Sequence, residues 1–172
     1  MRKVALCLGI SIDGYIARRD HTFDFLFLPE DYSMQPFFDR IDTAFLGRKT
    51  WEVTKEFGPP GSGEGTRSFV FSHRLEPGER EGVIVTRESP EAIVERLRRE
   101  PGKDMWLMGG GELVRHFLRE DLVDELYLGI VPTLLGDGIP LFPAGFPQRD
   151  FRLVGHESFS RGLVTLRYER SR

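Results

Sequence analysis

The sequence predicts an α/β fold with a mixed, mostly parallel central sheet, helices on both of its faces and an antiparallel hairpin at its C-terminal edge. Three observations lead to this prediction. Short apolar runs alternate with helical patterns as far as about residue 119, which is typical of parallel strands joined by helices. Two of these runs pass through glycine directly into a helical pattern, at 43–52 and 105–119. The apolar runs at 151–159 and 163–168 are separated only by Ser160-Arg161-Gly162, and so short a turn requires antiparallel pairing.

The composition excludes several classes of protein. With 172 residues, of which 40% are hydrophobic and 30% charged, the chain is expected to form one globular domain over residues 1–172. The net charge of −3 leaves no basic excess for nucleic acid, and no apolar run approaches the roughly 20 residues that cross a membrane. One cysteine, Cys7, and four scattered histidines offer no metal-ligand spacing, so no metal is predicted. We therefore expect a cytoplasmic protein.

The N-terminal part begins with a buried strand. Residues 4–10 are apolar and too few for a stable helix. The aromatic-rich residues 23–28 either cross back over the core or line a pocket, and Phe27 is a candidate for contact with a flat substrate there. A helix is expected from Pro29, and Pro36 should break or restart it.

A second strand, at 43–46, runs directly into the junction Gly47-Arg48-Lys49-Thr50 and a helical pattern. Cations at the N-terminus of a helix oppose the helix dipole, and an anion bound there would reconcile the two. The junction therefore indicates a phosphate site, with a solvated surface pair as the alternative. The glycine- and proline-rich residues 58–65 predict a mobile surface loop.

Two further strands are expected at 68–72 and 82–86, and both end in polar or basic residues. The first ends in Ser72-His73-Arg74 and the second in Thr86-Arg87. A helix is expected over 90–99, with Ser89 as its N-cap and a proline at its first position.

The strand at 105–108 ends in the triplet Gly109-Gly110-Gly111, from which a helix should run to about Arg119. Glycine allows positive φ and close approach of a phosphate to the backbone, although a tight turn without a ligand is the alternative. Parallel strands end on one edge of a sheet, so the four strand ends should converge there. Their common location predicts an anion-binding rim. A strand at 122–131 and a glycine- and proline-rich loop at 132–142 then lead to the terminal hairpin.

The order of these landmarks resembles the dihydrofolate-reductase-like fold family, in particular the branch with the reductase domain of bacterial riboflavin biosynthesis. As an ordered set the motifs are specific, and they extend over nearly the whole chain. The resemblance implies a three-layer fold, an NADPH-dependent reductase and a homodimer. The motifs are Ile10-Ser-Ile-Asp-Gly-Tyr-Ile-Ala17, Leu46-Gly-Arg-Lys-Thr-Trp-Glu52, Met108-Gly-Gly-Gly-Glu112, and Leu126-Tyr-Leu128 leading to Leu135-Gly-Asp-Gly-Ile-Pro-Leu-Phe142.

The resemblance assigns most of this rim to NADPH. The Gly47 junction would contact the cofactor phosphates, the Ser72 segment the 2′-phosphate, and Thr86 with Arg87 the adenine end. The glycine triplet would carry the pyrophosphate, with a cis peptide between its first two residues, and the loop after the first strand would face the nicotinamide. The implied cofactor-binding residues are Gly9, Ile10, Ile16, Ala17, Gly47, Arg48, Lys49, Thr50, Ser72, His73, Arg74, Thr86, Arg87, Met108, Gly109, Gly110, Gly111, Glu112 and Leu113.

Asp31 is the candidate catalytic and substrate-binding residue, because the resemblance places it where folate reductases carry the carboxylate that holds the substrate. A surface acid at a helix start is the alternative. Asp13 is a second candidate for substrate binding, although an Asp-Gly turn also explains it. The threonine that partners the family carboxylate falls at Gly129, which argues against dihydrofolate as the substrate.

The expected function is hydride transfer from NADPH to a small heterocycle of pteridine or pyrimidine type. The alternatives are 5-amino-6-(5-phosphoribosylamino)uracil reductase, dihydrofolate reductase, and, in another class, a nucleotide-binding sensor without catalysis.

Overall fold

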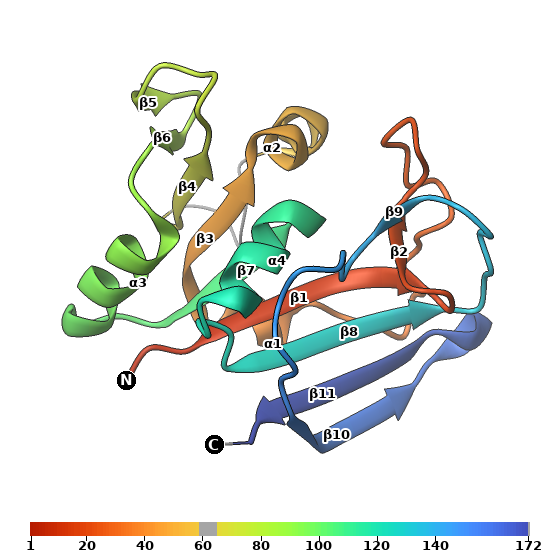
Figure 1. Cartoon of the computed structure of the whole chain (residues 1–172). Coiled ribbons are helices and arrows are strands. Elements are labelled where there is room, and N and C mark those ends of the chain that lie inside the picture. Colours follow the sequence, from red (N-terminus) through yellow and green to blue (C-terminus); the bar gives the residue numbers. More distant parts are fainter. Residues whose placement is uncertain (59–64, 172) are drawn as a thin grey trace.

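A nine-stranded sheet runs through the part of the chain that the structure, a computed structural model, describes: residues 1–58 and 65–171 (Figure 1). Its order is β10-β11-β8-β1-β7-β3-β4-β6-β5, and β2 pairs with β9 in a separate small sheet. The strands are β1 (Val4–Ser11), β2 (Tyr15–Ala17), β3 (Ile41–Gly47), β4 (Arg67–Phe71), β5 (Gly78–Arg80), β6 (Val83–Thr86), β7 (Asp104–Gly109), β8 (Glu125–Val131), β9 (Ile139–Pro140), β10 (Phe151–Ser158) and β11 (Val164–Arg170).

The central strands from β8 to β6 all run parallel to their neighbours. At one edge β11 pairs antiparallel with β8 and carries the hairpin partner β10, while β5 pairs antiparallel with β6 at the other edge. The predicted mixed sheet with a C-terminal hairpin is confirmed. Because β7, β3, β4 and β6 are adjacent and parallel, their carboxyl ends form one continuous rim.

Helices α3 (Pro90–Arg99) and α4 (Gly111–Arg119) cover one face of the sheet (Figure 1). Their apolar residues, among them Ile93 and Phe117, pack on Leu6, Phe45 and Leu107 in a fully buried core. The Ser89 side chain accepts a hydrogen bond from the Ala92 N–H, at 3.3 Å, so the predicted N-cap of α3 is confirmed.

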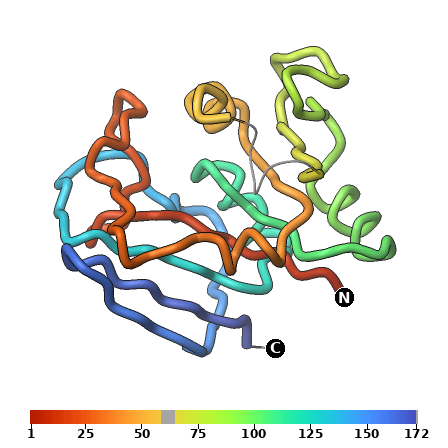
Figure 2. Tube along the Cα trace, turned by 180° about the vertical axis from the view of Figure 1, so that it is seen from behind, coloured from red at the N-terminus to blue at the C-terminus, as the bar shows by residue number. Residues whose placement is uncertain are grey.

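Helices α1 (Gln35–Phe38) and α2 (Arg48–Thr54) pack on the opposite face, and Figure 2, seen from that side, shows the chain between β2 and β3 crossing in front of the sheet. Phe37 and Trp51 meet Trp106 there, and the Trp106 indole donates to the Cys7 carbonyl at 2.9 Å. Burial raises the pKa of the Cys7 thiol, which fits an inert core residue. Two short 3-10 helices, Lys55–Phe57 and Ser160–Gly162, complete the list.

The predicted helix from Pro29 is wrong. The Tyr32 N–H donates to the Pro29 carbonyl in a turn, and only the single helical turn of α1 forms, with Pro36 in its first turn. Proline is accepted at that position, but it cannot continue a helix that starts earlier.

Two other boundaries differ from the prediction. The strand expected from residue 122 begins at Glu125, and the 132–142 loop contains β9, which was not predicted. The loop predicted at 58–65 lies largely outside the described residues. Among the described residues no helix is long and apolar enough to cross a membrane.

The amino ends of the central strands are held by ion pairs, on the opposite edge of the sheet from the rim. Arg40 donates to Asp104 at 2.7 Å and to Glu125 at 2.6 Å, and Lys3 donates to Glu125 at 2.6 Å. Glu125 is buried. This cluster ties β1, β3, β7 and β8 together and leaves the carboxyl ends free for a ligand.

Candidate functional site

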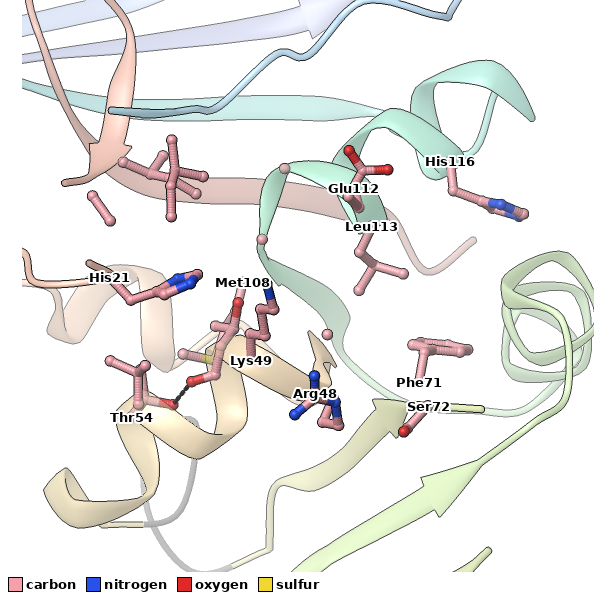
Figure 3. A pocket seen from close by; sticks show the side chains of 18 of the residues that line it. His21, Arg48, Lys49, Thr54, Phe71, Ser72, Met108, Glu112, Leu113 and His116 are labelled. Atoms are coloured by element: carbon pink, nitrogen blue, oxygen red, sulfur yellow. Dashed lines mark hydrogen bonds between the residues drawn. The ribbon is translucent and has the colours of Figure 1, made fainter. Parts of the chain in front are cut away.

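A cavity of about 1060 Å³ opens along the carboxyl ends of the strands. Its size is at the upper end of the range for small-molecule sites. Figure 3 shows Arg48, Lys49 and Met108 in its middle, His21 on one side, and Phe71 and Ser72 on the other. Four predicted strand ends, those of β3, β4, β6 and β7, contribute to its lining, so the predicted convergence on one rim is confirmed.

Most of the residues assigned to the cofactor line this cavity. Those that do are Ile16, Ala17, Gly47, Arg48, Lys49, Thr50, Ser72, His73, Thr86, Arg87, Met108, Gly110, Gly111, Glu112 and Leu113. Four others do not. Gly109 is buried beneath the turn, Gly9 lies under Leu26, Ile10 belongs to the core, and Arg74 is exposed outside the lining.

The glycine turn is built so that backbone, not side chains, faces the cavity. The peptide between Gly109 and Gly110 is cis, as expected, and Gly109 has a φ of 104°. A Cβ at Gly110 would lie 3.2 Å from the Thr50 Oγ1, and one at Gly111 would lie 2.5 Å from the Pro140 carbonyl oxygen. Gly110 is also the N-cap of α4 and supplies no side-chain acceptor for the first N–H groups of that helix. The turn therefore leaves donors available to an anion.

The charged side chains around the cavity are mostly basic. Arg48 holds both oxygens of Glu52 at 2.7 Å, one turn along α2, and remains on the cavity wall. Lys49 has no ion-pair partner among residues 1–58 and 65–171. On the far side of the cavity, Glu112 in the first turn of α4 forms an ion pair with Arg115, which screens the negative charge of Glu112. The chain as a whole has a net charge of −3, so the excess of basic side chains is a local property of the cavity.

Asp31 lies away from the cavity. Its carboxylate accepts hydrogen bonds from the Ser160 N–H at 2.9 Å and the Ser160 hydroxyl at 2.7 Å, and it is exposed. The hydroxyl, followed by the N–H, lowers the pKa of Asp31. This carboxylate thus joins the chain before α1 to the terminal hairpin.

Asp13 and Phe27 also lie outside the cavity lining. Asp13 accepts from the Ser11 hydroxyl at 2.6 Å and from the N–H groups of Leu135 and Gly136 at 3.1 and 2.8 Å, so it fastens the 132–142 loop to the first-strand loop. The Ser11 hydroxyl is the main cause of the lowered pKa of Asp13. Phe27 lies beneath the Arg161 guanidinium, 3.9 Å from the ring centre.

Phe23 and Leu26 line the cavity, which confirms the pocket-lining alternative for part of residues 23–28. Several other lining residues were not predicted. They come from the segment after β2, the start of α3, the middle of α4 and strand β9: Arg19, His21, Glu88, Ser89, Pro90, His116, Ile139 and Pro140. The small β2–β9 sheet brings two of these segments together from positions more than 100 residues apart, and each is unremarkable in local sequence.

A family model described as the RibD C-terminal domain matches residues 2–165. The chain belongs to the RibD C-terminal domain family. The Bacillus subtilis protein YwjB, described as uncharacterized, is 35% identical to it over 99% of both chains.

Solved structures agree with the fold of this RibD C-terminal domain protein. A putative riboflavin biosynthesis protein from Shewanella sp. PV-4 superposes over 100% of both chains with a TM-score of 0.85 and 24% identity. A diaminohydroxyphosphoribosylaminopyrimidine deaminase/5-amino-6-(5-phosphoribosylamino)uracil reductase from Thermotoga maritima has a TM-score of 0.75 at 17% identity, and the match covers 99% of this chain but 57% of that one. These likenesses confirm the predicted dihydrofolate-reductase-like, mostly parallel architecture.

Proposed function

We propose that this protein is an NADPH-dependent reductase that transfers a hydride to a small heterocyclic substrate of pteridine or pyrimidine type. The observation that carries the proposal is the convergence of four strand ends, with a glycine turn and basic side chains, on one large cavity. Membership of the RibD C-terminal domain family supports it.

The glycine turn fits the pyrophosphate of a dinucleotide. The first turn of α4 offers N–H donors without a capping side chain. Glycine at 110 and 111 lets the turn pack closely against Thr50 and Pro140, where a Cβ would clash. The uncapped donors suit a phosphate held by backbone groups at a helix N-terminus. Thr50, whose hydroxyl lies beside Gly110, would add a further donor.

The basic side chains favour NADPH over NADH. Arg48 and Lys49 lie in the middle of the cavity, with Ser72 to one side of them at the end of β4 (Figure 3). His73, which follows Ser72, also lines the cavity. A guanidinium and hydroxyls match the acceptor oxygens of a 2′-phosphate. Thr86 and Arg87, at the end of β6, would border the adenine. Arg74, outside the lining, is no longer part of the proposed 2′-phosphate site.

The opposite end of the cavity would hold the nicotinamide and the substrate. Its walls are the apolar side chains of Leu8, Ile16, Ala17 and Leu26. When bound, NADPH supplies the hydride itself, so the protein needs to align the two rings and to exclude water. The apolar wall serves both needs. We assign no proton donor. Asp31 is not retained as one, because its carboxylate accepts two hydrogen bonds from Ser160 outside the cavity.

Turnover assays test this proposal. Purified protein should oxidise NADPH in the presence of dihydrofolate or 5-amino-6-(5-phosphoribosylamino)uracil. Arg48→Ala should raise the NADPH KM about 10-fold or more, as expected for loss of a charged hydrogen bond. Arg74→Ala is the matched control and should leave that KM unchanged. NADPH binding without reduction of either substrate would favour the nucleotide sensor. Equal weakening of NADPH and NADH in Arg48→Ala would contradict the 2′-phosphate role.

We also propose a homodimer. Strand β10 forms an edge of the sheet, and Leu134 and Leu153 are 69% and 47% exposed on the terminal part of the chain. Light scattering after gel filtration should give twice the monomer mass of 19.8 kDa. A monomeric mass at micromolar protein would contradict this.

A further inference from the structure

Three metal-ligating side chains meet where the first turn of α3 approaches the end of α4. Glu91 comes from α3, His116 from α4, and Glu120 from the residue that ends α4. One donor atom from each lies within 4.8 Å of the others, and the His116 Nε2 is 2.8 Å from the Glu91 Oε1. His116 and Glu120 are four residues apart, which places them on one face of the helix. Glu91 is 25 residues away in sequence, so only the tertiary fold brings the third ligand in.

This cluster is partly shielded from water and incompletely satisfied. The side chains of Glu91, His116 and Glu120 are 34%, 31% and 35% exposed. The second carboxylate oxygen of Glu91, Oε2, is buried and has no partner that meets hydrogen-bond geometry within the described part of the chain, although the Ser89 side chain also interacts with this carboxyl. A buried carboxylate oxygen normally has a partner, and a bound cation would provide one.

We propose that Glu91, His116 and Glu120 bind one divalent transition-metal ion, with Zn²⁺ the best match. An imidazole with two carboxylates suits Zn²⁺, whereas Mg²⁺ and Ca²⁺ prefer sites made only of oxygen ligands. Three protein ligands leave a coordination position for water or for an anionic group. His116 lines the cavity, so the ion would lie at the α3–α4 border of the cavity. The inference stands apart from the proposed reductase activity.

Arg119 contacts two of the three proposed ligands and so competes with an ion. Its Nε donates to the Glu120 Oε1 at 2.7 Å, and its guanidinium lies 3.3 Å from the His116 Nδ1. Metal binding requires this side chain, which is half exposed, to turn away into solvent. Removing Arg119 should therefore tighten metal binding. A hydrogen-bonded link between α3 and α4 with no metal function predicts no such gain, so Arg119 distinguishes the two interpretations.

Isothermal titration of ZnCl₂ into chelator-stripped, full-length protein tests the site. We expect one ion per chain, with MgCl₂ giving no binding heat. His116→Ala and Glu91→Gln should each weaken Zn²⁺ about tenfold or more, the scale on which even supporting partners affect metal sites. Arg119→Ala should strengthen it several-fold. His156→Ala, an exposed histidine on β10 outside the cluster, is the matched control and should bind as the wild type does.

Thermal melts of the stripped variants separate loss of ligand from loss of fold. Glu120→Gln, at the exposed end of α4, provides a second ligand variant if Glu91→Gln is destabilised. The proposal is overturned if the wild type takes up no Zn²⁺ below about millimolar concentration. It is equally overturned if His116→Ala binds as tightly as the wild type, if His156→Ala loses as much affinity as His116→Ala, or if Arg119→Ala weakens the ion.

Discussion

Gly111→Ala offers the sharpest test of the glycine turn. The added Cβ would lie 2.5 Å from the Pro140 carbonyl oxygen and 3.3 Å from the Pro143 Cδ, so strand β9 must move away from α4 by several tenths of an ångström. Overpacking of this kind costs about 1–3 kcal/mol. The gain of up to about 1 kcal/mol that alanine has over glycine applies to the interior of a helix, and Gly111 is the first residue of α4, so the net destabilisation stays at about 1–3 kcal/mol. At about 2–4 °C per kcal/mol for a domain of this size, the Tm should fall by about 2–12 °C.

The same displacement should weaken NADPH, because Pro140 and Gly111 both line the cavity. Differential scanning fluorimetry gives the Tm, and quenching of tryptophan fluorescence on titration gives the NADPH Kd, which we expect to rise about tenfold, or roughly 1.4 kcal/mol. Gly155→Ala on β10 is the matched control, since its Cβ meets nothing closer than 3.9 Å. An unchanged Tm together with an unchanged Kd in Gly111→Ala would refute the close approach of β9 to the turn.

Three further predictions concern the frame around the site. Burial alone would raise the pKa of Glu125, but the hydrogen bonds from Lys3 and Arg40 outweigh it and lower that pKa. The stability that this ion pairing contributes is fully present above pH 4.5, the ordinary pKa, and is lost as the pH falls through the lower pKa of the folded protein. Glu125→Ala should lower the free energy of unfolding by about 3 kcal/mol in urea titrations at neutral pH and should flatten the loss of stability at acidic pH. An unchanged loss of stability at acidic pH would count against the ion cluster. Ser89→Ala should cost about 1 kcal/mol through loss of the α3 N-cap, and a loss below a few tenths would mean that the cap is not stabilising. Asp31→Asn should leave kcat and the KM of the heterocyclic substrate unchanged, because its carboxylate binds Ser160. A tenfold loss of kcat/KM for that substrate, about 1.4 kcal/mol, would return Asp31 to the substrate site.

The parallel core of the fold could be read from the sequence because each central strand is a short apolar run followed by a polar or glycine-rich junction. Periodicity also located α3 and α4, whose apolar positions repeat at helical spacing. The expected helix start at Pro29 is wrong, because residues 29–34 form turns, whereas the expected restart at Pro36 is confirmed by α1. The two-residue strand β9 carries no periodic signal, and its pairing with β2 depends on the tertiary fold.

The candidate site also contains residues that the sequence could predict and residues that it could not. The basic and glycine junctions were predictable because a parallel sheet gathers its strand ends on one rim. The expectation for Asp31 depended on register through an irregular loop, and the structure places its carboxylate on Ser160 instead. His21 and His116 line the cavity without any local motif, because one sits on a turn and the other on a helix face that local sequence cannot orient.

Direct titration of the wild-type protein with NADPH and NADH tests the central claim that this cavity is a dinucleotide site. We predict saturable binding of one NADPH per chain, with a Kd in the micromolar range and NADH at least about tenfold weaker. Absence of binding for both nucleotides below millimolar concentration would contradict the claim.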